Sequence, residues 1–194
     1  MPILGTIASQ VPANLPANSF ESIATVSLSS STSSATFSSI PSTYKHLQVR
    51  GTFIPTATDF SAVFRLNSDA TIGNYIAHTM SSSNGYDNSI SQSPSSLRIL
   101  YTQDLNNSLY PASFVLDILD YADTNKATTT RTFAGISSNN IAVGAERVVL
   151  TSGLWTPTNA VNTVTILSAT GGYGNTVGSN FAANSKFALY GIKG

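Results

Sequence analysis

The chain has 194 residues, nine of them basic and nine acidic, so its formal net charge is zero and only 9% of its residues are charged. A sequence without a cluster of Lys and Arg predicts neither nucleic-acid binding nor attachment to an anionic membrane. The lack of cysteine excludes disulfides, thiolate metal sites and a cysteine nucleophile. The length and uniform composition favour one main domain, and no stretch approaches the roughly 18 apolar residues of a membrane span.

Residues 1–19 are expected to form an extended arm outside the main domain. Pro2, Pro12 and Pro16 are incompatible with a regular helix or a central strand. Fully extended, the arm would reach up to ~60 Å, at about 3.3 Å per residue. We expect it to bind a neighbouring subunit, and the alternative is that it folds back over an edge of its own sheet. The residues expected to make this contact are apolar: Ile3, Leu4, Ile7, Val11 and Leu15.

From residue 20 onward, apolar and polar residues alternate with the period of two that is typical of strands. The clearest run is 45–53, and the same alternation returns at 60–66 after a break at Pro55, which predicts a hairpin. Residues 114–119 are apolar on both faces and are expected to lie centrally in a sheet, covered on both sides. The other expected strands are residues 20–28, 35–40, 75–80, 97–101, 131–136, 147–151, 161–167 and 186–192.

Serine-rich residues 81–96 are expected to form a long loop, and the glycine-rich residues 171–178 another, since they lack the Lys-Ser/Thr ending of a phosphate loop. We find no amphipathic helix of normal length. Many short strands joined by turns predict an all-β fold for residues 20–194: a two-sheet antiparallel β-sandwich, jelly-roll-like, with an extended N-terminal arm.

Catalytic chemistry finds little support in the sequence. His46 and His78 are the only histidines, and neither accompanies a recognisable orienting acid or a G-x-S-x-G motif. We therefore expect no enzyme and no cofactor.

Paired carboxylates are the better enzymatic case, because Asp117, Asp120 and Asp123 cluster and Glu146 could join them. On a strand, however, Asp117 and Asp120 point to opposite faces. A calcium site at Asp120, Asp123 and Asn125 is the alternative to a purely structural turn, and we favour the turn because no D-x-D-x-D-G loop is present.

Three aromatic residues in turn-like segments could stack on a sugar ring: Tyr86, Trp155 and Tyr173. For Trp155 we favour the other interpretation, in which the indole packs at one end of the core.

Five segments stand out together: residues 19–26, residues 37–51 and residues 180–194, with Asp117-Ile118-Leu119-Asp120-Tyr121 followed by Lys126, and Ser152-Gly153-Leu154-Trp155 followed by Thr158, in between. In this order they resemble small virion proteins of tailed bacteriophages. The resemblance covers the chain from residue 19 to its last residue and leaves the arm outside. It implies a decoration or cement protein on the outside of a capsid, or a part of a head or tail fibre.

We expect the first of these roles, with the domain on the outer surface of the major capsid protein shell and the arm fastening it there. The expected partners are the major capsid protein and sister copies, with a homotrimer as the closed assembly at a three-fold junction. The protein would be made in the host cytoplasm and reside in the virion. The alternative is a glycan- or receptor-binding fibre module that uses the three aromatic residues.

Overall fold

The computed structural model describes residues 19–57, 59–83, 86–92, 94–102, 110–137, 147–170 and 179–194, with residues 83, 86–92 and 102 described through their backbone. Within these ranges the chain forms strands and turns, and no helix is present that could cross a membrane. The arm, as residues 1–18, lies outside the described residues, and so does the glycine-rich segment 171–178.

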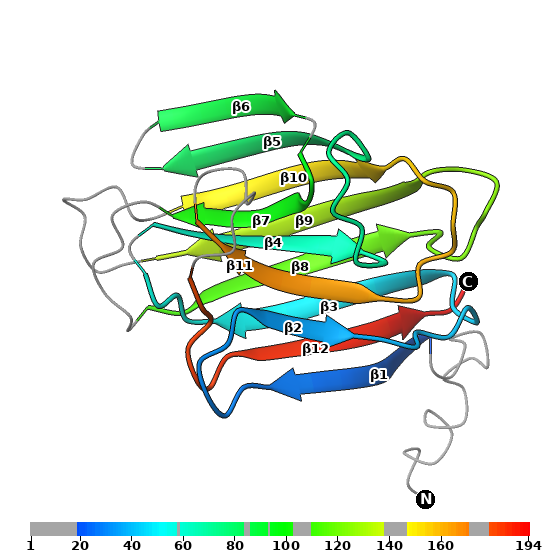
Figure 1. Cartoon of the computed structure of the whole chain (residues 1–194), viewed down its shortest axis with the longest axis horizontal. Coiled ribbons are helices and arrows are strands. Elements are labelled where there is room, and N and C mark those ends of the chain that lie inside the picture. The colour runs from blue at the N-terminus through cyan, green and yellow to red at the C-terminus, as the bar shows by residue number, and fades with distance from the viewer. Residues whose placement is uncertain are drawn as a thin grey trace, which may run out of the picture.

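Two antiparallel sheets contain the described strands (Figure 1). The larger has eight strands in the order β1-β12-β3-β8-β9-β10-β5-β6, and the smaller has four in the order β2-β11-β4-β7. In chain order the strands are β1 (Phe20–Ser27), β2 (Ser34–Phe37), β3 (His46–Phe53), β4 (Phe60–Leu66), β5 (Tyr75–Ser83), β6 (Tyr86–Gln92), β7 (Leu97–Thr102), β8 (Ala112–Leu119), β9 (Thr128–Ile136), β10 (Arg147–Trp155), β11 (Val164–Ala169) and β12 (Lys186–Ile192).

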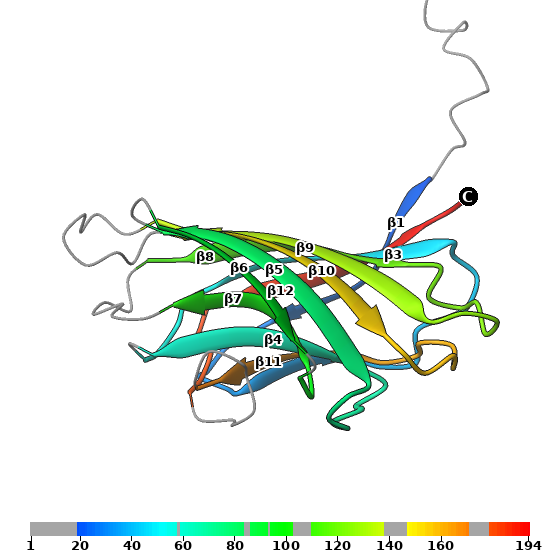
Figure 2. The same cartoon turned by 90° about the horizontal axis from the view of Figure 1, so that it is seen from above.

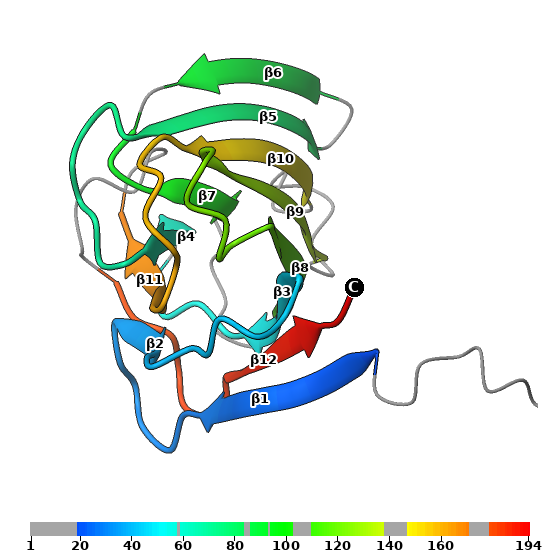
Figure 3. The same cartoon turned by 90° about the vertical axis from the view of Figure 1, so that its right-hand side faces the viewer.

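The two sheets pack face to face as a sandwich. Seen from above, β4 and β11 form one layer beneath β8, β9 and β10 of the other (Figure 2). From the side, the large sheet bends around the small one, with β6 and β5 at one end of the bend and β1 at the other (Figure 3). The predicted fold class, a two-sheet antiparallel sandwich of jelly-roll type, is confirmed.

Aromatic packing fills one half of the core. Phe53 of β3 lies 5.6 Å from Phe60 of β4 and 5.3 Å from Phe181, measured between ring centroids. Phe114 and Phe187 complete the cluster from β8 and β12. These rings come from both sheets and from the segment before β12, so they tie the two layers together.

Glycines make room for two of these close approaches in the large sheet. A Cβ atom on Gly51 would lie 2.3 Å from the ring of Phe114, and one on Gly191 would lie 2.3 Å from the ring of Tyr44. Gly51 thus allows the phenylalanine cluster to press on β3. Gly191, in the same way, allows the ring of Tyr44 to pack directly against β12.

Threonine lines the other half of the interior, on β5, β9 and β10. The hydroxyls of Thr79 and Thr151 lie 3.2 Å apart on neighbouring strands. Thr128, Thr130 and Thr132 occupy the inward positions of β9, and all three are buried. This half of the core therefore buries less hydrocarbon per residue than the phenylalanine half.

The predicted hairpin between residues 45–53 and 60–66 is wrong, because β3 and β4 belong to different sheets. Strand β3 pairs with β12 on one side and β8 on the other, which leaves no free edge for β4. Pro55 forms an isolated bridge to Phe181 at the crossing point between the layers. The proline therefore marks a change of sheet rather than a turn within one sheet.

Two further predictions need correction. The central place of β8 is confirmed, but its second face is not covered: Val115, Asp117 and Leu119 point outward and stay partly exposed. Residues 81–96 are not one loop, because they contain the end of β5 and the whole of β6, which pairs with β5 over seven residues from Ala77↔Gln92 to Ser83↔Tyr86. Serine-rich sequence hides this strand because its backbone pairing needs no apolar alternation.

Candidate functional site

The outer face of the large sheet carries a patch of exposed apolar side chains. Leu150 of β10 is directly opposite Met80 of β5 and Phe133 of β9, so the three form one row across three strands. Val148 lies on the same face of β10, two residues from Leu150. These four residues, which we call the outer patch, are 49–59% exposed. Apolar side chains in such a continuous group mark a surface for binding other molecules more often than isolated ones do.

Local sequence explains why these residues face outward. Strand β9 places threonines at its inward positions and Phe133 among its outward ones, the reverse of the usual distribution. On β10, Val149 is buried while its neighbours Val148 and Leu150 are exposed. The patch was not predicted, although the sequence carries a signal for it in the apolar run Val148-Val149-Leu150 and in a phenylalanine, Phe133, that interrupts the threonines of β9.

A row of polar side chains borders the outer patch on one side. It runs along the sheet through Gln48, Asp117, Arg131, Ser152 and His78, which are in register on neighbouring strands. The Gln48 side-chain amide donates a 2.7 Å hydrogen bond to the Asp117 carboxylate. Together with Met80, Leu150 and the strand backbones, His78, Arg131 and Ser152 line a shallow depression of about 220 Å³. An apolar centre with a polar rim is the usual composition of a protein–protein contact.

Aromatic and cationic groups gather at the other end of the same face. The Arg50 guanidinium lies 5.0 Å from the ring centre of Phe20 and 5.3 Å from that of Tyr190. The two rings are themselves 5.3 Å apart. Cation–π contact and the packing of the two tilted rings therefore hold the start of β1 to β12 and β3, next to the first described residue.

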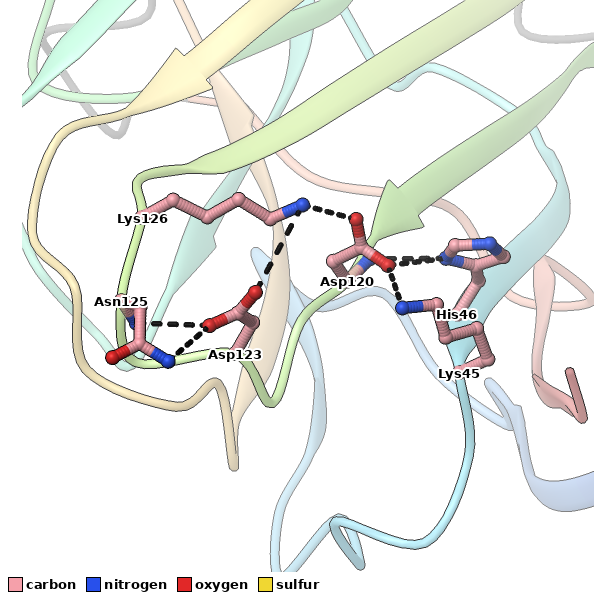
Figure 4. Close-up of polar contacts among 6 residues, drawn as sticks. All are labelled: Lys45, His46, Asp120, Asp123, Asn125 and Lys126. Atoms are coloured by element: carbon pink, nitrogen blue, oxygen red, sulfur yellow. Dashed lines mark hydrogen bonds and ion pairs between the residues drawn. The ribbon is translucent and has the colours of Figure 1, made fainter.

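The turn after β8 holds an ion-pair cluster in place of the calcium site considered above (Figure 4). The Asp120 carboxylate lies 2.7 Å from the Lys45 ammonium and is also paired with Lys126. Hydrogen bonds from Lys126 and Lys45 lower the pKa of Asp120 to about 2. The Asp123 carboxylate accepts from the backbone N–H of Asn125 at 2.9 Å, as a turn-capping aspartate does.

This arrangement favours the structural turn. The lysines neutralise the Asp120 carboxylate, and His46 accepts a 3.0 Å hydrogen bond from the Asp120 backbone N–H through Nδ1. Among the residues that the structure describes, no group of three or more acidic, His or Cys side chains could hold a metal ion. Glu146, the fourth carboxylate of the glycosidase hypothesis, lies outside the described residues.

Trp155 lies at the end of β10 rather than in a turn, and its side chain is only 2% exposed. The indole N–H donates a 2.8 Å hydrogen bond to the Asp69 carboxylate, which also accepts from Asn74 at 2.8 Å and from the Thr71 backbone N–H at 2.9 Å. Burial raises the pKa of Asp69, but these hydrogen bonds outweigh burial and lower it to about 2. The ring is thus part of the core and does not offer a face on which a sugar could stack.

A wide depression of about 620 Å³ opens beside this network. Its lining is mainly polar and comes from two loops and the end of β10: Asn67, Asp69, Asn74, Trp155, Pro157, Asn159, Ala160 and Asn162. The Asn67 amide cross-links the loops, because it donates to the Ala160 carbonyl and accepts from the Asn162 backbone N–H, each at 2.9 Å. The depression is therefore bordered by hydrogen-bonded loops and rich in amide groups.

The structure does not describe the side chains of the remaining candidate binding residues. The arm residues Ile3, Leu4, Ile7, Val11 and Leu15, and Tyr173, lie outside the described residues. Tyr86 is the first residue of β6, of which the structure describes the backbone. Their roles stay predictions.

No protein-family model and no curated protein sequence matches the chain. Among solved structures, the galectin LEC-6 of Caenorhabditis elegans has 13% sequence identity and a TM-score of 0.32, over 84% of this chain and 98% of that one. The VP2 subviral particle of infectious bursal disease virus has 9% identity and a TM-score of 0.12, over 89% of this chain and 38% of that one. Likenesses of this strength carry no argument about function.

Proposed function

We propose that the chain is a structural, non-enzymatic protein of a bacteriophage particle, and more narrowly a decoration or cement subunit on the outer surface of the capsid shell. The observation that carries the proposal is the outer patch. Four large apolar side chains, each about half exposed, lie together on a sheet face that no other part of the described chain covers. Leaving such a group in water is unfavourable, so a partner that covers it gains hydrophobic free energy.

The body around the patch suits a crowded protein surface. The chain has no net charge, so neighbouring copies do not repel one another over long distances. The phenylalanine cluster and the Asp120 ion pairs brace the sandwich without a disulfide. The sequence resemblance to phage virion proteins supports the same role.

In the proposed assembly, the sandwich sits on the shell of the major capsid protein and the N-terminal arm ties it to a neighbour. Closed symmetry makes a homotrimer the simplest arrangement at a three-fold junction. Many weak contacts repeated over a shell then add up to strong attachment.

Purified particles of the phage that encodes the chain provide the test. We expect mass spectrometry to find the protein in them and a reconstruction to place its density on the shell. Particles stripped of the protein should lose resistance to heat and regain it when the full-length chain is added back. A protein that is absent from purified particles, or whose density lies only in a fibre, contradicts the proposal.

The depression beside Asp69 favours a second candidate, a glycan-binding fibre module. The exposed side chains of Asn159 and Asn162 present amide groups that suit sugar hydroxyls, whereas the amides of Asn67 and Asn74 are engaged within the protein. A glycan array on the full-length protein tests it. Saturable binding that Asn159→Ala abolishes, in a protein that melts like the wild type, would favour this function over decoration; no binding would count against it.

A further inference from the structure

The outer patch and the N-terminal arm are chemically matched. None of residues 1–18 carries a charged side chain, and five of them are large aliphatic residues. The outer patch is equally free of charge, with the polar row of Asp117, Arg131 and His78 to one side of it. An uncharged apolar segment can cover such a surface without burying an ionised group, which would be costly.

Backbone pairing at the start of β1 fixes the direction of the chain at the first described residue. The Ser19 carbonyl accepts a 3.0 Å hydrogen bond from the Lys193 backbone N–H, so the β1–β12 ladder continues to residue 19. The described chain therefore begins at residue 19 in line with the strand, at the rim of the sandwich beside the C-terminal end of β12 (Figure 2). An arm that keeps this direction points away from its own body.

Reaching its own patch would require the arm to turn sideways across the strands. Strand β10 is five places from β1 in the sheet order, about 24 Å at the ~4.8 Å spacing of neighbouring strands. The route passes over Tyr190, Arg50 and Asp117, where the outer face is occupied by charged and hydrogen-bonded side chains. An arm that docks on a neighbouring copy needs neither the sideways turn nor the path over these polar side chains. Fully extended, the arm is long enough for this, at up to ~60 Å.

We propose that the outer patch is the docking site for the N-terminal arm of a second copy of this chain. The link joins two different surfaces, arm to patch, so each copy gives one contact and receives one. Such a head-to-tail link closes into a ring when its rotation allows, and a trimer is one such ring. The inference rests on the proposed function, because a capsid shell would bring copies of the chain side by side. It identifies the neighbour that the arm binds as a second copy of this chain.

Complementation between two full-length variants tests the link. The arm variant carries Ile3→Asn, Leu4→Asn and Ile7→Asn and keeps its patch, while the patch variant carries Phe133→Ser and Leu150→Ser and keeps its arm. We expect wild type to self-associate in sedimentation velocity, and each variant alone to sediment as a 20.3 kDa monomer. Mixed together, the two variants should form a 1:1 complex, because one supplies the arm and the other the patch.

Ile76→Ser is the matched control, since Ile76 is 48% exposed on the same face of β5 but two rows away from the patch. It should self-associate like wild type, whereas loss of two patch anchors should weaken association by about 30-fold or more. Equal far-UV spectra for all variants, and equal melting temperatures at concentrations low enough for wild type to be monomeric, show that folding is unchanged. A variant that fails this check is replaced by the milder Leu150→Thr.

Three results would overturn the inference. The first is a wild-type chain that stays monomeric at every soluble concentration, as an arm bound to its own patch would make it. The second is an arm variant that still self-associates, which would mean that patches pair with each other. The third is no complex between the two variants. Absence of the protein from phage particles would remove the proposed function alone, because the complementation is measured without any shell.

Discussion

Asp69 provides the sharpest test of the energetics inferred for the end of the sandwich. Its carboxylate accepts three hydrogen bonds, from Trp155, Asn74 and the Thr71 backbone. In Asp69→Asn, the amide has one oxygen for three donors, so in either orientation its NH₂ group faces at least one N–H. The remaining bonds also lose the charge that makes such bonds about twice as strong as neutral ones.

From these losses we expect Asp69→Asn to lower the free energy of unfolding by about 2 kcal/mol near pH 7. For a domain of this size, that corresponds to a fall in Tm of roughly 4–8 °C. Trp155 is the only tryptophan, so its fluorescence during urea unfolding reports on this very network. The exposed carboxylate of Asp59 supplies the control, and Asp59→Asn should unfold like wild type.

The pH dependence follows from the lowered pKa. Because folding lowers the pKa of Asp69 from 3.8 to about 2, the ionised carboxylate stabilises the fold above the unfolded pKa. That stabilisation is lost as the pH falls through about 2. The gap in stability between wild type and Asp69→Asn should thus be full above pH ~5 and shrink toward pH ~2. A variant as stable as wild type, or a gap that is constant from pH ~5 to ~2, would refute the reasoning.

Four other outcomes are expected. Gly191→Ala should destabilise the fold by about 1–3 kcal/mol in urea titrations, because its Cβ would overlap a tyrosine ring, whereas Gly135→Ala, whose nearest contact is 3.6 Å away, should be nearly neutral. Thr132→Val should raise stability by about 1 kcal/mol, since its buried hydroxyl has no hydrogen-bond partner among the described residues, and a loss in the same titration would argue against this. Asp120→Asn should lower Tm at low salt and less so at high salt, because its lysine partners are exposed to screening ions; melts at two ionic strengths check this. Deleting residues 1–18 should leave the far-UV spectrum and the melting curve of the monomer unchanged, since both sheets begin after them, yet abolish capsid attachment in a pull-down with stripped shells.

Sequence periodicity sufficed for the class of fold and for most strands, because alternation reports which side of a strand is buried. It could not place the strands relative to one another. Pro55 correctly signalled the end of β3, but whether the chain then pairs with β3 or crosses to the other sheet depends on the partners that β3 already has. Strand β6 escaped detection for a related reason: the bonds that hold it lie in its backbone.

The candidate site was harder to predict than the fold. Strand β9 buries threonine and exposes Phe133, so an analysis that assigns apolar residues to the core places the wrong side inward. For Trp155 the favoured interpretation, packing at one end of the core, is confirmed, but neighbouring Gly and Pro left an exposed turn open because the Asp69 carboxylate that holds the indole is 86 residues away. In both cases the deciding contact is distant in sequence.

The uneven interior of the sandwich has a consequence for how it opens. Strands β3, β8 and β12 are held by phenylalanine rings, whereas β5, β9 and β10 rest on threonines. Native-state hydrogen exchange should therefore reveal two cooperative units, with amides of the threonine half exchanging at lower opening free energy. The outer patch belongs to that weaker half, so a bound arm would stabilise β5, β9 and β10, the strands with the lower opening free energy. Assembly and the last step of local folding would then be a single event.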